Sequence, residues 1–204
     1  MQMLNTNLFI VTGGPGTGKT TTLLELAKRG YKYTPEVARQ IIREQIGHGG
    51  IALPWGDRER YTRLMMERSI QSFEENTPAP QPMFADRGLP DTLCYARLTQ
   101  HPDEKRIRRA CDQYRYASTV FFAPVWEEIY QTDTERKQDF AEAVRTSDLM
   151  LKVYHECGYS LIELPKTSPP ERAKFIVKQL SVPRFDTPVP LAHNLDHGSV
   201  RGDR

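Results

Sequence analysis

A short apolar run, a glycine-rich loop and an amphipathic helix follow one another near the start of the chain. Residues 8–11, Leu-Phe-Ile-Val, are continuously apolar, which is typical of a strand buried on both faces of a parallel sheet. The loop GGPGTGKTT follows, and residues 19–29 then carry their apolar side chains on one helical face before Gly30 ends the helix. A buried strand that passes through glycines directly into a helix predicts an α/β fold.

The glycine-rich loop matches the phosphate-binding pattern GxxxxGK(S/T) at every fixed position. Glycines let successive backbone N–H groups surround one anion, and the N-terminus of the following helix adds partial positive charge. In this pattern Lys19 bridges the β- and γ-phosphates, the Thr20 hydroxyl ligates Mg²⁺, and Thr21 can reach the α-phosphate. We therefore predict that a nucleoside triphosphate and Mg²⁺ bind to Gly13, Gly14, Pro15, Gly16, Thr17, Gly18, Lys19, Thr20 and Thr21.

Four further apolar runs alternate with helical patterns in the rest of the chain. We expect strands near residues 31–34, 83–85, 118–122 and 159–164, and helices near residues 35–46, 57–75, 90–100, 103–116, 134–155 and 170–180. This alternation is typical of a parallel sheet covered by helices, in which ligands bind beyond the C-terminal ends of the strands. It predicts one domain over residues 1–181 and a Pro-rich tail over residues 182–204 that is flexible or bound by a partner.

Composition narrows the class of protein. Hydrophobic residues make up 38% of the chain and charged residues 26%, which suits a folded globular domain. The net charge of +2 indicates no concentrated basic surface, so nucleic-acid binding is not expected. Three widely spaced cysteines argue against a disulfide framework and against a zinc site. The N-terminus has neither a signal-peptide pattern nor an apolar run of membrane-spanning length, so we expect a cytoplasmic protein without a membrane anchor.

The third apolar run ends in Asp86-Arg87-Gly88, which helps to separate the classes of phosphate-binding protein. An ATPase that activates water usually has Glu directly after the Asp of this strand, but Arg87 stands there, and the NKxD motif of a GTPase is absent. The pair Asp86-Arg87 is typical of nucleoside and nucleotide kinases, in which the acid organises Mg²⁺ and the arginine meets a phosphate or sugar of the acceptor. The alternative is a surface turn in which Asp86 caps the next helix.

Further candidate residues follow the second and fourth strands. Glu36 lies where a kinase carboxylate often accepts the proton of the attacking hydroxyl, and Arg39 lies one turn further along the same helix. Glu36 can instead simply stabilise the start of that helix through its dipole. Residues 126–140 have the composition of a lid, in which Arg136 would donate to the migrating phosphoryl group. Ordinary charge pairing on a solvated helix is the alternative for Arg136.

Two other segments carry weaker signals. The basic run KRIRR at residues 105–109 is more typical of a solvated helix face than of a site for an acceptor phosphate. Residues 165–167, Pro-Lys-Thr, follow the fifth strand, where related kinases hold the adenine ring largely through backbone groups. Neither segment identifies a side chain that we assign to the site.

Five segments together resemble one family: GGPGTGKTTTL, PEVAR, FADRG, the FFAPVW–TDTER segment and LPKTSPPERAKFI. The family comprises small bacterial predicted ATPases with an AAA-type domain, close to the kinase domain of bifunctional NAD-biosynthesis regulators, which phosphorylates ribosylnicotinamide. The resemblance covers about residues 7–180. It implies ATP and Mg²⁺ binding on a P-loop three-layer sandwich like that of nucleoside and nucleotide kinases, with five parallel strands in the order 2-3-1-4-5.

Two main hypotheses follow. The first is a kinase that phosphorylates a nucleoside- or nucleotide-like small molecule and needs a closed cavity walled by residues 36–56 and 87–100. The second is an ATPase switch that regulates a protein partner through the tail, or as a homodimer. A nucleotide-binding module with negligible turnover is a third alternative. The kinase hypothesis assigns catalysis to Lys19, Glu36, Asp86, Arg87 and Arg136, the acceptor to Glu36, Arg39 and Arg87, and Mg²⁺ to Thr20 and Asp86.

Overall fold

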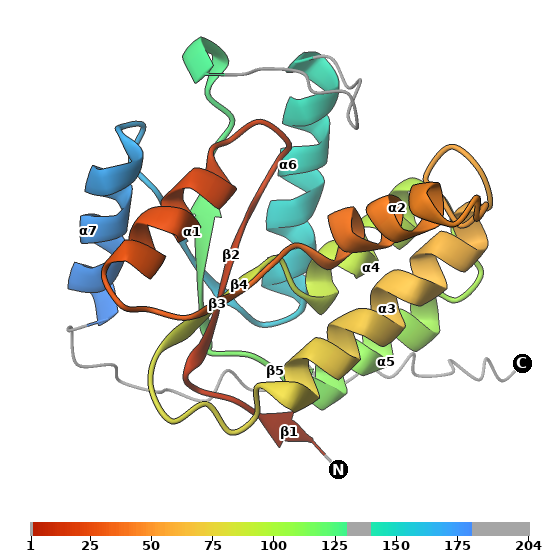
Figure 1. Cartoon of the computed structure of the whole chain (residues 1–204), viewed down its shortest axis with the longest axis horizontal. Coiled ribbons are helices and arrows are strands. Elements are labelled where there is room, and N and C mark those ends of the chain that lie inside the picture. Colours follow the sequence, from red (N-terminus) through yellow and green to blue (C-terminus); the bar gives the residue numbers. More distant parts are fainter. Residues whose placement is uncertain (1, 130–139, 181–204) are drawn as a thin grey trace, which may run out of the picture.

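Five parallel strands form the central sheet of the protein, whose computed structural model describes residues 2–129 and 140–180 (Figure 1). Their order across the sheet is β3-β4-β2-β6-β7. Counted along the chain, these five strands lie in the order 2-3-1-4-5, so the predicted parallel sheet and its order are confirmed. The strands are β2 (Leu8–Gly13), β3 (Tyr33–Thr34), β4 (Met83–Asp86), β6 (Thr119–Ala123) and β7 (Ser160–Glu163).

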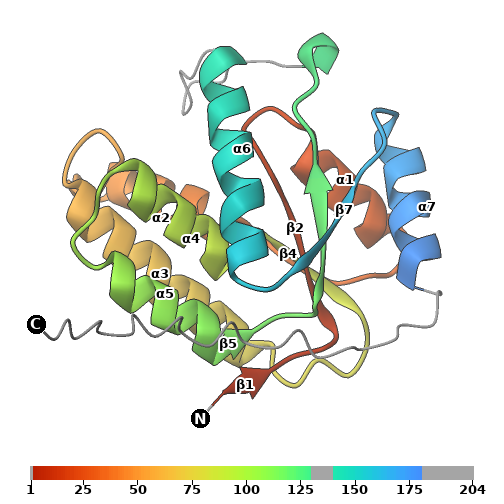
Figure 2. The ribbon, with the colours of Figure 1, turned by 180° about the vertical axis from the view of Figure 1, so that it is seen from behind.

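Alternate residues of the strands belong to two separate hydrophobic cores, because side chains along a strand point to opposite faces. Leu8 and Ile10 of β2 lie in one core, and Phe9 and Val11 lie in the other. Helices α3 to α6 cover the first face and α1 and α7 the second, as the two views show (Figures 1 and 2). The helices are α1 (Lys19–Lys28), α2 (Val37–Gly47), α3 (Arg58–Glu75), α4 (Leu89–Leu98), α5 (Glu104–Gln113), α6 (Phe140–Glu156) and α7 (Pro169–Leu180). The molecule is therefore the predicted three-layer sandwich.

Helix α2 lies outside these two cores and packs on α3 through a smaller cluster. Ile41 and Ile42 of α2 contact Leu53 of the following loop and Tyr61 and Met65 of α3. Asp57 caps α3 as expected, since its side chain accepts a hydrogen bond of 2.9 Å from the backbone N–H of Arg60. The α2–α3 pair thus forms a separate wall beside the sheet.

The buried face of helix α6 agrees only in part with the one that the sequence predicts. The helical spacing predicts that Phe140, Val144, Ser147, Leu151 and Tyr154 share one face and that Thr134 caps the helix. Ser147 and Tyr154 are buried, but Val144 is 37% exposed, and the buried face includes Ala143, Met150 and Val153 instead. The helix passes close to the glycine-rich loop, since the Ala143 carbonyl oxygen lies 3.4 Å from where a Cβ on Gly14 would stand. Thr134 lies outside the described residues.

Three short elements were not predicted. Strands β1 (Met3–Leu4) and β5 (Tyr114–Arg115) pair in parallel as a second, two-stranded sheet, and η1 (Glu127–Ile129) is a single 3₁₀ turn. Elements this short contain no periodic pattern to detect. The predicted tail over residues 182–204 lies outside the described residues. None of the helices in the described part of the chain has the length and hydropathy needed to cross a bilayer.

The close contact between β2 and β6 requires glycine at position 13. Gly13 has φ +141°, and a Cβ there would lie 2.2 Å from the backbone oxygen of Ala123. We expect Gly13→Ala to lower the free energy of unfolding by roughly 2–5 kcal/mol through backbone strain and overlap. Gly47→Ala is the control, because no atom lies within 4 Å of the added methyl group. Urea unfolding should place the control within about 1 kcal/mol of the parent chain. Equal stability of the two variants would contradict this account.

Candidate functional site

The glycine-rich loop connects β2 to α1. Its glycines have backbone conformations that L-amino acids rarely adopt. Gly13, Gly16 and Gly18 have φ angles of 141°, 71° and 77°. Gly18 is the residue that precedes the first turn of α1, so the loop ends at the N-terminus of a helix. A helix N-terminus favours an anion because its backbone N–H groups lack intrahelical acceptors. The nine predicted residues over 13–21 all lie in this loop and the first turn of α1.

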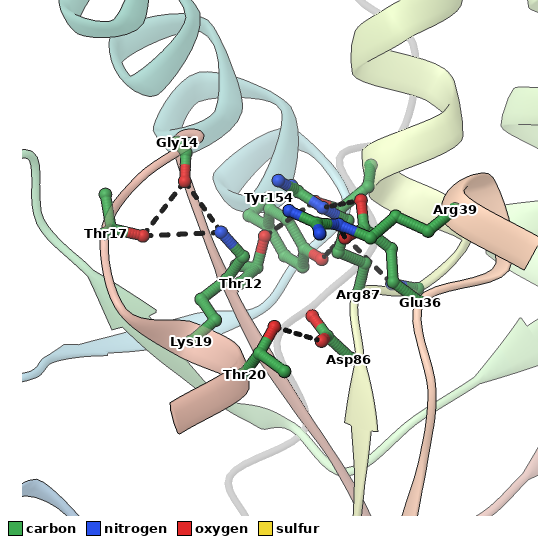
Figure 3. A network of polar contacts seen from close by, with 12 residues as sticks. Thr12, Gly14, Thr17, Lys19, Thr20, Glu36, Arg39, Asp86, Arg87 and Tyr154 are labelled. Atoms are coloured by element: carbon green, nitrogen blue, oxygen red, sulfur yellow. Dashed lines mark hydrogen bonds and ion pairs between the residues drawn. The ribbon is translucent and has the colours of Figure 1, made fainter. Parts of the chain in front are cut away.

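Lys19 folds back into the loop (Figure 3). Its ammonium group donates to the Gly14 carbonyl oxygen at 2.7 Å and to the Thr17 hydroxyl at 3.3 Å, and the Thr17 hydroxyl itself donates to the Gly14 carbonyl. Lys19 is only 5% exposed. A buried ammonium at this place suits an incoming phosphate, whose oxygens are stronger acceptors for it than a backbone carbonyl.

Thr20 and Asp86 meet beside this loop, where β4 ends. The Thr20 hydroxyl donates to Asp86 Oδ2 at 3.3 Å. Asp86 Oδ1 is buried and has no hydrogen-bond partner within the described residues. Burial raises the pKa of Asp86, and Lys19 and Glu36 act on it in opposite directions, Lys19 lowering it and Glu36 raising it. An unpartnered carboxylate oxygen next to a hydroxyl is a donor set that suits Mg²⁺, which prefers few protein oxygens together with phosphates and water.

The donor set also limits which metals could bind. No group of three or more His, Cys, Asp or Glu side chains that could hold a metal ion occurs among residues 2–129 and 140–180. A metal at Thr20 and Asp86 would therefore depend on phosphate oxygens and water for its remaining ligands.

Glu36, Arg87 and Asp91 form a buried chain of ion pairs across the sheet edge. Arg87 Nε donates to Glu36 at 3.0 Å, and Arg87 Nη1 donates to Asp91 at 2.8 Å. Glu36 also accepts from Arg39 at 3.1 Å (Figure 3). Asp91 further accepts from Thr12, from Tyr154 and from the backbone N–H of Gly88. The predicted residues Glu36, Arg39 and Arg87 are thus in direct contact.

Arg87 has an unusual backbone and a strongly stabilised charge. Its φ angle is 73°, a value that residues other than glycine rarely adopt. Burial acts against its charge, but the carboxylates of Glu36, Asp91 and Asp86 outweigh it and raise the pKa of Arg87 above the ordinary value. The next residue, Gly88, packs closely on β2, since a Cβ there would lie 2.6 Å from Ile10 Cδ1. The strained backbone of Arg87 persists because the surrounding ion pairs hold its side chain in one position.

A cavity of about 530 Å³ opens beside Asp86 and Arg87. One end has the polar residues Glu36, Asp86, Arg87 and Asp91 together with Pro15 of the phosphate loop. The other end is apolar and aromatic, with Tyr61 and Tyr95 in an edge-to-face contact at 5.5 Å. Further lining residues include Ala38, Ile42, Pro54, Trp55, Arg58, Met65, Cys94, Leu98 and Met150. Helices α2, α3, α4 and α6 therefore line a half-open cavity of small-molecule size next to the phosphate loop.

Other predicted segments lie elsewhere. Arg136 lies outside the described residues, so its place relative to the loop stays a prediction. In the basic run of α5, Arg108 pairs with Asp112 and donates to the Glu156 carbonyl. None of the residues of this run lines the cavity, which favours the solvated-face interpretation. Residues 165–167 lie near the loop through Arg172, which donates to the carbonyl oxygens of Pro165 and Thr17.

Sequence reasoning missed Asp91 and Arg172. Asp91 follows Asp86 by five residues and looked like an ordinary first-turn acid of α4, which it also is, since it accepts from the N–H of Gly88. Arg172 had a detectable signal, because it shares a helical face with the apolar residues Ala173 and Ile176. A charged residue on an apolar face suggests a buried polar contact.

Comparison with known proteins gives a family and a fold. A family model described as AAA domain matches residues 8–172. None of the curated proteins compared with the chain matches it. Similar solved structures include NadR protein in complex with NR, with a TM-score of 0.66 and 21% identity over 89% of this chain and 54% of that one. This chain therefore spans about half the length of NadR.

Two solved kinase structures are similar to this chain over nearly their whole length. Thymidylate kinase from Ehrlichia chaffeensis has a TM-score of 0.54 and 16% identity, over 87% of this chain and 100% of that one. Shikimate kinase from Acinetobacter baumannii in complex with shikimate has a TM-score of 0.51 and 18% identity, over 86% and 93% of the respective chains. At these identities the similarity concerns the fold, which is that of P-loop kinases.

The ion-pair chain makes a testable contribution to stability. Asp91→Ala leaves the buried guanidinium of Arg87 with one carboxylate partner fewer, so we expect the free energy of unfolding to fall by about 3–5 kcal/mol. Asp112→Ala is the matched control, because Asp112 pairs with Arg108 on the surface, where half of its side chain is exposed. Denaturant unfolding should place the control within about 1 kcal/mol of the parent chain. A similar fall in the free energy of unfolding of both variants would mean that the buried ion pairs stabilise the fold no more than the surface pair does.

Proposed function

This chain belongs to the AAA domain family, and we propose that it is an ATP-dependent kinase for a nucleoside- or nucleotide-like small molecule. The observation that carries the proposal is the cavity next to Asp86, Arg87 and Pro15, which lies between helix walls where the sequence argument required an acceptor site. An enzyme that only hydrolyses ATP needs water and a base at this place, but no second cavity of about 530 Å³.

The proposal assigns the nucleotide to residues 13–21. The loop backbone and the N-terminus of α1 surround the β-phosphate, and Lys19 turns from the Gly14 carbonyl to bridge the β- and γ-phosphates. Thr20 and Asp86 hold Mg²⁺, directly or through its water shell. When bound, Mg²⁺ neutralises phosphate charge and fixes the phosphate geometry. Lys19 and the loop N–H groups then stabilise the charge that develops on the transferred phosphoryl group.

The acceptor lies with its reactive hydroxyl at the polar end of the cavity. We assign Glu36 as the general base that takes the hydroxyl proton, with Arg87 and Arg39 holding it in place. Glu36 lines the polar end of the cavity, where its carboxylate can accept a hydrogen bond from the acceptor hydroxyl. Arg87 can also donate to an oxygen of the acceptor, since its fixed backbone points it at the cavity wall.

The apolar end of the cavity takes the rest of the acceptor. Tyr61, Tyr95 and Trp55 offer aromatic surface, which suits a planar ring such as a nucleobase. The NadR structure is in complex with NR and the shikimate kinase structure is in complex with shikimate, so proteins of similar fold bind small molecules. Arg136 is assigned to the lid, as the donor that closes over the phosphates. Because the proposed donor is ATP, we place the protein in the cytoplasm.

A transfer screen tests the proposal directly. The chain is incubated with γ-³²P-ATP and Mg²⁺ beside nucleosides including ribosylnicotinamide, nucleoside monophosphates and small alcohols, with a no-acceptor reaction that reports plain hydrolysis. We expect labelled product from at least one nucleoside- or nucleotide-like acceptor, and Lys19→Ala should abolish it. Release of phosphate at the same rate with and without every acceptor would support the ATPase alternative instead.

Glu36→Gln separates proton transfer from nucleotide binding. The amide keeps the shape of the side chain but cannot accept the proton, so we expect phosphoryl transfer to fall by about 10²- to 10⁴-fold. Affinity for ATP should be unchanged, because Glu36 lies on the acceptor side of the loop. Glu44→Gln is the matched control in the same helix, since Glu44 pairs with Arg68 on the surface. Full transfer activity in Glu36→Gln would remove Glu36 from the mechanism.

A further inference from the structure

Arg172 is a buried arginine on the inner face of α7. It is 1% exposed and lies beside Ala173 and Ile176, which belong to the core between α7 and the sheet. Its Nε donates to the Pro165 carbonyl at 2.8 Å, and its Nη1 donates to the Thr17 carbonyl at 2.6 Å. The guanidinium therefore connects the loop after β7 to the phosphate loop.

The charge of Arg172 has no compensating anion among the described residues. Both hydrogen-bond acceptors are neutral carbonyls, and Nη2 is buried without a partner in residues 2–129 and 140–180. Burial alone lowers the pKa of Arg172, and no carboxylate acts against it. Burying a guanidinium in this way is unfavourable unless an anion pairs with it. Arg87 differs in this respect, because Glu36 and Asp91 both pair with it.

The position of Arg172 indicates which anion would pair with it. Nη1 lies 3.3 Å from where a Cβ on Gly18 would stand, and the Thr21 hydroxyl lies 3.5 Å from the same point. The Trp126 ring lies across the guanidinium, with its centroid 5.4 Å from Cζ. Arg172 is thus at the start of α1, on the side of Thr21 and away from the cavity, which it does not line. In the proposed nucleotide orientation this is the end of the phosphate chain nearest the base.

We propose that Arg172 is a nucleotide-binding residue whose free Nη2 donates to the α-phosphate of the bound nucleotide. The inference rests on the proposed function in one respect, since it requires that residues 13–21 bind the phosphates. Lys19 then holds the β- and γ-phosphates from inside the loop, and Arg172 and Thr21 hold the α-phosphate from outside it. A phosphate oxygen provides both the missing acceptor and the missing negative charge.

The test measures binding by calorimetry in the presence of Mg²⁺, with ADP and with inorganic pyrophosphate as probes. Pyrophosphate occupies the loop without an adenosine α-phosphate and so reports whether the loop itself is intact. We expect Arg172→Gln to weaken ADP binding by about 10- to 100-fold, the range for one lost charge-assisted hydrogen bond, and to leave pyrophosphate binding nearly unchanged. Arg172→Lys keeps the positive charge but loses the planar set of guanidinium donors. Its affinity for ADP should lie between that of the parent chain and that of Arg172→Gln.

Arg29→Gln is the matched control, because Arg29 also donates to a carbonyl of α7, that of Pro170, but is on the surface. It should bind both probes as the parent chain does. An equal loss for ADP and pyrophosphate in Arg172→Gln would mean that Arg172 only supports the loop through Thr17, and unchanged ADP affinity would mean that it has no part in binding. Either result overturns the inference. If Arg172→Gln does not fold, the ratio of ADP to pyrophosphate affinity in Arg172→Lys decides in the same way.

Failure of the proposed function gives a different result. If the parent chain and Arg29→Gln bind neither probe, residues 13–21 do not hold phosphates and the nucleotide assignment itself is wrong. If both bind ADP and pyrophosphate, the comparison with the Arg172 variants concerns this inference alone.

Discussion

The buried ion pairs of Arg87 with Glu36 and Asp91 join the walls of the cavity to the edge of the sheet. Glu36 stands at the start of α2, Arg87 directly after β4, and Asp91 in the first turn of α4. Asp91 also accepts from Thr12 of β2 and from Tyr154 of α6. Five elements therefore share one polar network. Because a buried network is stable only when its members are satisfied together, the cavity wall and the sheet edge keep one arrangement.

The same network lies between the phosphate loop and the cavity at the edge of the sheet. On the phosphate side, the Lys19 ammonium donates to the Gly14 carbonyl oxygen and to the Thr17 hydroxyl, both inside the phosphate loop. On the cavity side, the guanidinium of Arg87 pairs with Glu36 and Asp91. Asp86 lies between the two sides, so Lys19 lowers its pKa and Glu36 raises it. In the proposed mechanism, the phosphate charge and the acceptor proton therefore meet different residues.

The fold and the phosphate loop could be predicted from sequence because both depend on local pattern. Continuously apolar strands, Gly30 after α1 and Asp57 before α3 are signals contained within a few residues. Asp86, Arg87 and Glu36 were selected because they follow strands, and parallel strands bring their C-terminal ends to one edge. Their pairing was not predictable, since Glu36 and Arg87 are 51 residues apart and nothing local indicates their contact.

The parts that could not be predicted depend on packing between distant segments. Ala143 is buried and Val144 is 37% exposed, and this orientation of α6 depends on its packing against elements far apart in the chain. Arg172 reaches Thr17 across 155 residues, and only the packing of α7 against the loop makes that contact possible. The cavity has the same origin, because its volume is what remains after four helices have packed. Sequence could place its walls but not the space between them.

Two buried side-chain atoms within the described residues lack a hydrogen-bond partner, and they carry opposite charge. Asp86 Oδ1 and Arg172 Nη2 are those atoms, and they lie on either side of the phosphate loop. Each is unfavourable for the folded chain by itself, since a buried charged group loses water without a replacement. A cation at the first and a phosphate at the second would satisfy both at once. A nucleotide that carries its own metal ion is the simplest ligand with that pair of charges, so the unfavourable features of the free chain are the ones that its ligand would remove.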